Sequence, residues 1–260
     1  MASNKLITNK VGLEPRVVFE DEVVVVVDKP AGLVVNRAES VEGVTVQEWM
    51  ERKLQVTSYK LEVSKQQTEE ELLFAKRGGV VHRLDKETSG VMVLARTPAA
   101  LVELMRQFRE RETKKEYVAL VHGKLSPKAG FVSVPMRRTT RDRTKFGVGL
   151  GGRMTRTDYQ VVGEYTSTNS KYSDGFCLVE LMPKTGRTHQ LRVLLKHLQH
   201  PIVADDKYLG GKRLREDNKW CRRLFLHARK LGFIHPKDGK WVEYEVGLPE
   251  ELEEAWGRIR

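Results

Sequence analysis

The residue most suited to chemistry is Asp85, which stands in residues 78–94. Two apolar, β-prone runs flank a polar segment that also holds His82 and Arg83, and Thr88-Ser89-Gly90 supplies turn-forming residue types before the second run. A carboxylate on a turn between two strands is held by a rigid frame and can face a cleft. On local pattern alone, a plain hairpin with an incidental aspartate is the commoner interpretation.

A second stretch, residues 184–198, joins the end of a strand to a helix. Gly186 allows a tight turn, and Thr188 is a candidate helix cap. Thr188 and Arg192 stand four residues apart, so the guanidinium would leave the first turns of the helix where it could pair with a carboxylate. An ordinary surface arginine fits the same spacing. The predicted buried face of the helix consists of Leu191, Leu194, Leu195 and Leu198.

The net charge of the chain indicates which class of molecule it binds. The 260 residues include 46 Lys and Arg against 35 Asp and Glu, a formal net charge of +11. The basic excess gathers in residues 137–156 and 207–230, and a basic surface attracts polyanions, with counterion release as the gain for nucleic acids. We therefore favour RNA or DNA over a merely solvated basic face, with Arg141 and Arg143 among the expected phosphate contacts.

Several other classes of protein are excluded by what the sequence lacks. No apolar run is long enough for a membrane span, and the N-terminus shows no signal-peptide pattern. Cys177 and Cys221 stand far apart, which argues against a disulfide framework and for a cytoplasmic protein. His197 and His200 have the spacing closest to that of zinc ligands, but no zinc-binding motif surrounds them. These residues therefore give no indication of a metal site. The sequence also contains no P-loop and no GxSxG motif.

The periodicity predicts many short strands and few helices. Strands are expected within 17–27, with the valine run from Val23 buried on both faces, and at 33–35, 115–123, 157–162, 176–181, 231–235 and 241–246. Helices are expected after Thr45, whose capping box uses Glu48, after Thr97-Pro98, and at 249–260. Residues 55–77 read as an exposed loop ending in a short helix. The predicted class is α+β, with a mixed, mostly antiparallel central sheet flanked by helices.

Four motifs, in order along the chain, resemble those of the RluA-type family of RNA pseudouridine synthases. Residues 82–90, HRLDKETSG, match the catalytic motif HRLDxxTSG. Residues 28–32, DKPAG, resemble its DKPxG turn, and residues 115–120, KEYVAL, its K-x-Y-x-A strand. Residues 186–192, GRTHQLR, with HPI at 200–202, resemble the last motif. The similarity spans about residues 17–247, and chance does not account for four ordered motifs.

The resemblance implies isomerisation of uridine to pseudouridine within tRNA or rRNA, without cofactor or metal. Asp85 would be the essential carboxylate, either adding covalently or acting during glycosidic cleavage, and Arg192 would pair with it. Tyr117 would stack on the detached base, and Arg83 would help to fill the space left by a flipped uridine. Besides Arg141 and Arg143, the residues implied in substrate or RNA contact are His82, Arg83, Leu84, Thr88, Arg187, His189, Gln190 and Leu191.

The chain departs from the family pattern at four places, none of which removes a catalytic group. Asn36-Arg37 replaces the usual His-Pro, and Leu194 replaces a histidine. Gln199 and Ala204 each stand where relatives have glycine. We expect residues 1–16 to be an extension and 17–260 a single, monomeric catalytic domain without the S4 RNA-binding domain of many relatives.

Two hypotheses of different classes follow. The first is an active pseudouridine synthase, and the second is a catalytically silent RNA-binding protein on the same fold. A binder would need only basic residues, whereas this chain keeps Asp85, Tyr117 and Arg192 together. We therefore favour the enzyme.

Overall fold

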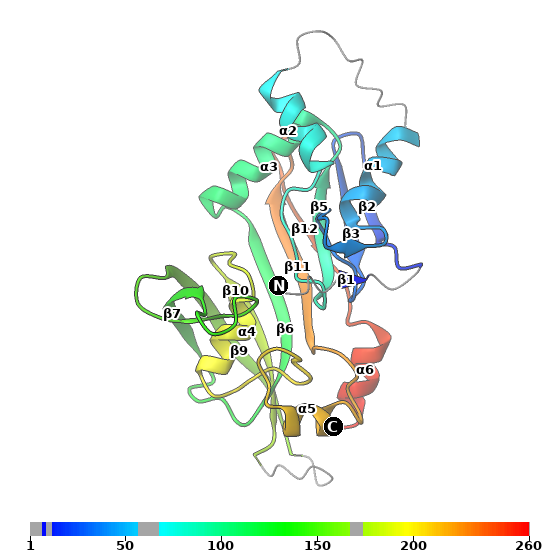
Figure 1. The fold of residues 1–260 in the computed structure, drawn as a ribbon. Coiled ribbons are helices and arrows are strands. Elements are labelled where there is room, and N and C mark those ends of the chain that lie inside the picture. The colour runs from blue at the N-terminus through cyan, green and yellow to red at the C-terminus, as the bar shows by residue number, and fades with distance from the viewer. Residues whose placement is uncertain (1–6, 9–11, 57–67, 167–173, 260) are drawn as a thin grey trace. The chain divides into compact units, whose positions relative to one another are not determined.

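A computed structural model describes residues 7–8, 12–56, 68–166 and 174–259 of the chain. The chain divides into two compact units, traced in Figure 1. The first unit comprises Met1–Lys114 and Lys230–Val246, and the second comprises Lys115–Arg229 and Gly247–Arg260. The expectation of one catalytic domain over residues 17–260 concerns both units together and stays a prediction.

The first unit is built on a sheet with the strand order β2-β3-β5-β11, and β12 pairs with β11. Val24 to Val27 are completely buried in β3, which confirms the prediction for four of the five valines of the run. Val23 lies just before the strand and is half-buried. A separate parallel pair, β1 with β4, joins Ile7–Thr8 to Val41–Glu42. The strands of the main sheet are β2 (Arg16–Glu20), β3 (Val24–Lys29), β5 (Ser89–Ala95), β11 (Leu226–Ile234) and β12 (Trp241–Glu245).

Local capping chemistry fixes the three helices of this unit, α1 (Val46–Val56), α2 (Glu69–Arg77) and α3 (Pro98–Glu110). Before α1, the Glu48 amide donates to the Thr45 hydroxyl at 3.2 Å and the Thr45 amide to the Glu48 carboxylate at 2.9 Å. Thr97 caps α3, and Pro98 occupies its first turn. The helices predicted after Thr45 and Thr97, and the short helix that ends residues 55–77, are confirmed; residues 57–67 lie outside the described residues.

Two predicted extended segments of the first unit differ from expectation. Residues 33–35 are not a strand, because the carbonyls of Val34 and Val35 accept the first amides of α1 at 3.0 and 2.9 Å. The first apolar run of residues 78–94 contributes only one bridge, from Val80 to Leu94. Gly79 precedes it at φ 76°, where a Cβ atom would come within 2.3 Å of the Ala95 carbonyl oxygen.

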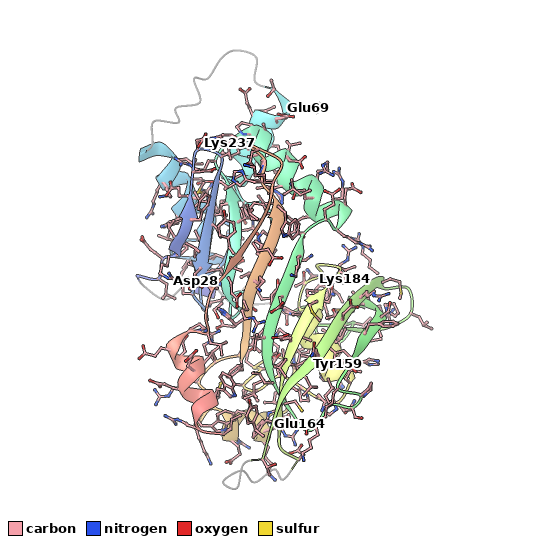
Figure 2. The ribbon with its side chains drawn as sticks, turned by 180° about the vertical axis from the view of Figure 1, so that it is seen from behind. Asp28, Glu69, Tyr159, Glu164, Lys184 and Lys237 are labelled. Carbon is pink, nitrogen blue, oxygen red and sulfur yellow. The ribbon has the colours of Figure 1, made fainter. Side chains whose placement is uncertain are left out.

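The second unit has the strand order β11-β6-β10-β9-β7-β8. β9 and β10 are antiparallel with Tyr159 opposite Leu181, which confirms their predicted pairing; Figure 2 shows Tyr159 and, just after β10, Lys184. The elements are β6 (Lys114–His122), β7 (Ala129–Arg138), β8 (Phe146–Val148), β9 (Arg153–Tyr165), β10 (Phe176–Pro183), α4 (Gln190–His197), α5 (Gly211–Asp217) and α6 (Glu250–Gly257). The α+β class with a mixed sheet is confirmed.

Three further features concern membrane spans, metal binding and the two cysteines. Within the described ranges, no helix is long and apolar enough to cross a bilayer. Among the same residues, no group of three or more His, Cys, Asp or Glu side chains is arranged to hold a metal ion. Cys177 and Cys221 are buried free thiols, and burial raises the pKa of Cys221 to about 12, so this thiol stays protonated and unreactive.

Both positions at which the chain replaces a family glycine have left-handed backbones, with φ 66° at Gln199 and φ 55° at Ala204. A residue with a Cβ atom pays about 1–2 kcal/mol for this conformation. We predict that Ala204→Gly raises the free energy of unfolding by about 0.5–1 kcal/mol, since glycine's greater freedom in the unfolded chain offsets part of the gain. Chemical denaturation measures this.

The control is Ala100→Gly in α3, where the backbone is right-handed. It should cost about 1 kcal/mol. Equal losses for the two variants would show that Ala204 is not strained.

Candidate functional site

Asp85 is half-buried at the start of a tight turn in the first unit. The Thr88 amide donates to the Asp85 carbonyl at 3.1 Å, and Thr88 itself is buried. Leu84, before the aspartate, is buried in the core, whereas Arg83 is exposed. The loop thus leaves the Asp85 side chain partly open, between the buried residues Leu84 and Thr88.

Lys29, the lysine of the DKPAG turn, holds this loop through hydrogen bonds of its ammonium group. Its side chain is completely buried. The ammonium donates to the carbonyls of Pro30 and Leu33 at 2.8 Å each, and to that of Lys86, next to Asp85, at 3.1 Å. The Gly32 amide donates to the same Lys86 carbonyl at 2.8 Å. The DKPAG turn therefore holds the main chain of the Asp85 loop at one point.

We predict that Lys29→Met lowers the free energy of unfolding by about 2–4 kcal/mol, because three buried or partly buried carbonyls lose a charged donor. Chemical denaturation measures the change. The matched control is Lys53→Met, since Lys53 pairs with Glu20 at 2.7 Å at a site where both side chains remain 26% exposed. That pair should contribute less than about 1 kcal/mol. Similar losses for the two variants would contradict the anchoring role of Lys29.

His82 supports the Asp85 loop from inside the unit. Its Nε2 accepts the Val93 amide of β5 at 3.2 Å. Its ring stacks on Phe108 of α3, with centroids 4.3 Å apart and planes at 19°. The resemblance implies contact of His82 with substrate or RNA. The contacts that the structure shows are within the protein, with Val93 and Phe108, and they hold the loop in place.

Tyr117 lies on β6 in the second unit, half-buried and packed against that unit's core. It stands opposite Leu181 of β10. Its neighbour Glu116 forms an ion pair with Arg229, which also binds Glu180 at 2.8 Å. This three-residue ionic group ties β6, β10 and β11 together beside the tyrosine.

Arg192 is 2% exposed, so the interpretation as an ordinary surface arginine is wrong. Its Nε and Nη2 donate to the two carboxylate oxygens of Asp205 at 2.9 and 2.6 Å, and Nη2 also reaches Asp206 at 2.8 Å. Asp205 in turn accepts the amides of Lys207 and Tyr208, each at 2.9 Å. A bidentate pair of this kind fixes the orientation of the guanidinium plane.

The helix carrying Arg192 does not begin as predicted. Thr188 is exposed and does not cap it; α4 begins at Gln190, after His189 in a left-handed conformation with φ 56°. The Gln190 side chain organises the turn instead: its Oε1 accepts from the Thr185 hydroxyl at 2.8 Å and the Arg187 amide at 3.0 Å. Its Nε2 donates to the hydroxyl of Thr157 at 3.0 Å.

His189 and Leu191, also implied as substrate or RNA contacts, are both buried. The Nδ1 of His189 lies 2.8 Å from the Tyr208 hydroxyl, which accepts the Phe146 amide at 3.0 Å. The Tyr208 ring lies 5.3 Å from the guanidinium carbon of Arg192. His189 and Arg192 are thus joined through Tyr208, while Leu191 belongs to the core of the unit.

Arg187, Arg141 and Arg143 are exposed. Arg141 and Arg143 lie in the loop between β7 and β8. Arg187 lines a pocket of about 390 Å³ in the second unit, together with three arginines that the sequence analysis did not single out: Arg137, Arg138 and Arg153.

The other functional residues missed at the sequence level are Lys29, Asp205 and Asp206. Lys29 could have been identified from its place in the DKPAG motif. The spacing in residues 184–198 predicts a carboxylate partner for Arg192, but it does not indicate the paired acids Asp205 and Asp206, thirteen and fourteen residues further on. Pairing across a turn of that length leaves no periodic signal in the sequence.

Comparison with known proteins identifies the family. The family model described as RNA pseudouridylate synthase matches residues 23–199. An uncharacterized RNA pseudouridine synthase of Chloroflexus aurantiacus is 42% identical over 68% of this chain and 52% of its own length. The ribosomal large subunit pseudouridine synthase D of Xanthomonas campestris is 35% identical over 94% of this chain and 69% of its own. The chain thus spans about half to two thirds of the length of these relatives.

A solved structure agrees in fold. Human RNA pseudouridylate synthase domain containing 4 superposes with a TM-score of 0.67 at 27% identity, covering 94% of this chain and 92% of the human one. The matched family segment includes the Asp85 loop, Tyr117 and Arg192. This chain belongs to the RNA pseudouridylate synthase family, and to its RluA-type branch, whose enzymes are isomerases acting on RNA.

Proposed function

We propose that this protein converts uridine to pseudouridine within an RNA chain and that Asp85 is the essential carboxylate. The observation that carries the proposal is the Asp85 turn, whose main chain Lys29 and Gly32 hold while the carboxylate stays half-exposed. In the reaction the N1–C1′ bond breaks, the uracil turns, and a C5–C1′ bond forms. C5 loses a proton and N1 gains one, so the reaction balances without a co-reactant.

Each remaining residue has a proposed part. Arg192 would be the arginine of the active site that the family resemblance implies, with Asp205 fixing the plane of its guanidinium group. Tyr117 would stack on the detached uracil and could relay the proton. Arg83, exposed beside Asp85, would occupy the space left by the flipped uridine.

Large-subunit rRNA is the first substrate to examine, because the Xanthomonas relative carries that name, and tRNA is the second. The test is incubation of the purified protein with uridine-labelled rRNA and tRNA transcripts, followed by assay of pseudouridine. Product on either RNA supports the proposal. Absence of product on all cellular RNAs, with RNA binding intact, would establish the silent RNA-binding protein instead. Action in the cytoplasm as a monomer stays a prediction.

We predict that Arg141→Glu/Arg143→Glu weakens RNA binding by about tenfold or more and lowers the slope of log affinity against log salt by about 1.5 units. Each phosphate contact contributes about 0.7–0.9 to that slope. Filter binding at several salt concentrations measures both quantities. An unchanged slope would mean that the loop between β7 and β8 does not contact phosphate.

A further inference from the structure

The arginine pocket, defined by Arg137, Arg138, Arg153 and Arg187, lies entirely in the second unit. Met136 and Phe146 form its apolar part, and Met136 is only 4% exposed. Among the lining residues that the structure describes there is no carboxylate, and neither Tyr117 nor Arg192 belongs to the lining. Four arginines and no acid are therefore among the described residues that line one cavity of about 390 Å³.

Three of the four guanidinium groups are not engaged elsewhere. In the described parts of the chain, the side chains of Arg137, Arg153 and Arg187 have no hydrogen-bond or ion-pair partner. Arg138 donates to the Arg143 carbonyl at 2.8 Å and lies 5.1 Å from the centre of the Phe146 ring. Like charges brought to one cavity repel each other, and an anion in the pocket removes that cost.

The backbone around the pocket is fixed by strand pairing. Arg137 pairs with Gly147 and Arg138 with Phe146 across β7 and β8, while Met136 faces Arg153 across β7 and β9. The turn between β8 and β9 requires glycine: a Cβ atom on Gly152 would come within 2.6 Å of the Met136 carbonyl. The strand register therefore fixes the backbone positions of Arg137, Arg138 and Arg153 beside the pocket.

We propose that this pocket is a phosphate subsite for RNA, binding the backbone of a segment that does not itself react. The inference rests on the proposed function for its substrate class. Guanidinium groups bind phosphate oxygens in a fork geometry, and several around one cavity suit the phosphodiester of a flexible strand. The Arg141–Arg143 loop would add outer contacts, whereas this pocket seats the phosphate.

The test is fluorescence anisotropy with a labelled oligouridylate of about twelve nucleotides, at several salt concentrations. Arg137→Ala/Arg153→Ala should bind about tenfold more weakly or worse, and the salt slope should fall by about 1.4, the value for two contacts on a single strand. The matched control is Arg52→Ala/Arg258→Ala, which removes the same charge from two exposed arginines outside the pocket. It should change affinity by less than about twofold.

A second pair of variants keeps all four arginines. Thr188 is exposed and lines the pocket. Thr188→Glu introduces a carboxylate and should weaken binding about tenfold, whereas the similarly sized Thr188→Gln should leave it within about twofold. The subsite would be overturned if the pocket double variant and the control double variant lost the same RNA affinity. Equal RNA affinity of Thr188→Glu and Thr188→Gln would overturn it too, and either result would indicate a diffuse basic surface.

Failure of the inference and failure of the proposed function can be distinguished. If the wild-type protein forms pseudouridine but Arg137→Ala/Arg153→Ala binds RNA as tightly as the control double variant, the phosphate subsite is refuted and the proposed enzymatic function is retained. If the wild type forms no pseudouridine but the pocket double alone loses affinity, the enzyme is refuted and the binding site stands.

Discussion

Asp85→Asn is expected to abolish pseudouridine formation, with a loss of about a thousandfold or more. The substitution keeps the size of the side chain and removes its negative charge, so neither nucleophilic addition nor proton transfer by the carboxylate remains. RNA affinity should stay within about twofold, since an anionic carboxylate does not attract phosphate. Single-turnover assay of labelled transcripts, with anisotropy on the same preparations, measures both.

The loop around Asp85 supplies the control. Glu87 lies two residues further on in the same turn and is equally half-buried. Glu87→Gln removes one negative charge from the same loop and should retain most of the activity. If Asp85→Asn remains active, the carboxylate does not carry the chemistry. If affinity falls in step with activity, the loss reflects RNA binding by Asp85 and not catalysis.

Arg192→Met is expected to lower the free energy of unfolding by about 3–5 kcal/mol. Asp205 is completely buried, and without the guanidinium its carboxylate becomes an uncompensated interior charge. Chemical denaturation followed by tryptophan fluorescence measures the loss, because Trp220 and Trp256 lie in the same unit. Lys219→Met breaks an exposed pair with Glu216 and should cost less than about 0.5 kcal/mol.

A double variant separates charge from packing. Arg192→Met/Asp205→Asn removes the isolated charge, and the asparagine oxygen can still accept the amides of Lys207 and Tyr208. At least half of the lost stability should return. If the double variant is no more stable than Arg192→Met, the arginine stabilises the unit through its packing and not through the ion pair.

The fold was predictable where its causes are local. Thr45 with Glu48, and Thr97 with Pro98, fix helix starts within a few residues, and the valine run of β3 identifies a strand buried on both faces. The start of α4 was predicted at Thr188 and begins later, because the left-handed His189 and the Gln190 side chain arrange that turn. Four-residue spacing contains no information about such a turn.

The site was predictable in its motif residues and not in their partners. Asp85, Tyr117 and Arg192 each stand in a recognisable pattern. Lys29 reaches the Lys86 carbonyl across 57 residues, and the pocket arginines come together through the antiparallel register of three strands. Contacts at these separations are set by tertiary packing. Arg141 and Arg143 were therefore chosen from the basic segment, while Arg137 and Arg153 were passed over.

The division of the chain between its two units has a consequence for synthesis. Leu231, Phe233 and Val246 belong to the core of the first unit, yet they follow the whole of residues 115–229. At about 5–20 residues per second, the ribosome needs roughly six to twenty-three seconds to make that intervening segment. During this interval the N-terminal part lacks the apolar residues of β11 and Val246 that pack on its core in the folded unit. A nascent chain stalled before Lys230 should therefore bind chaperones, and release past Val246 should end that binding.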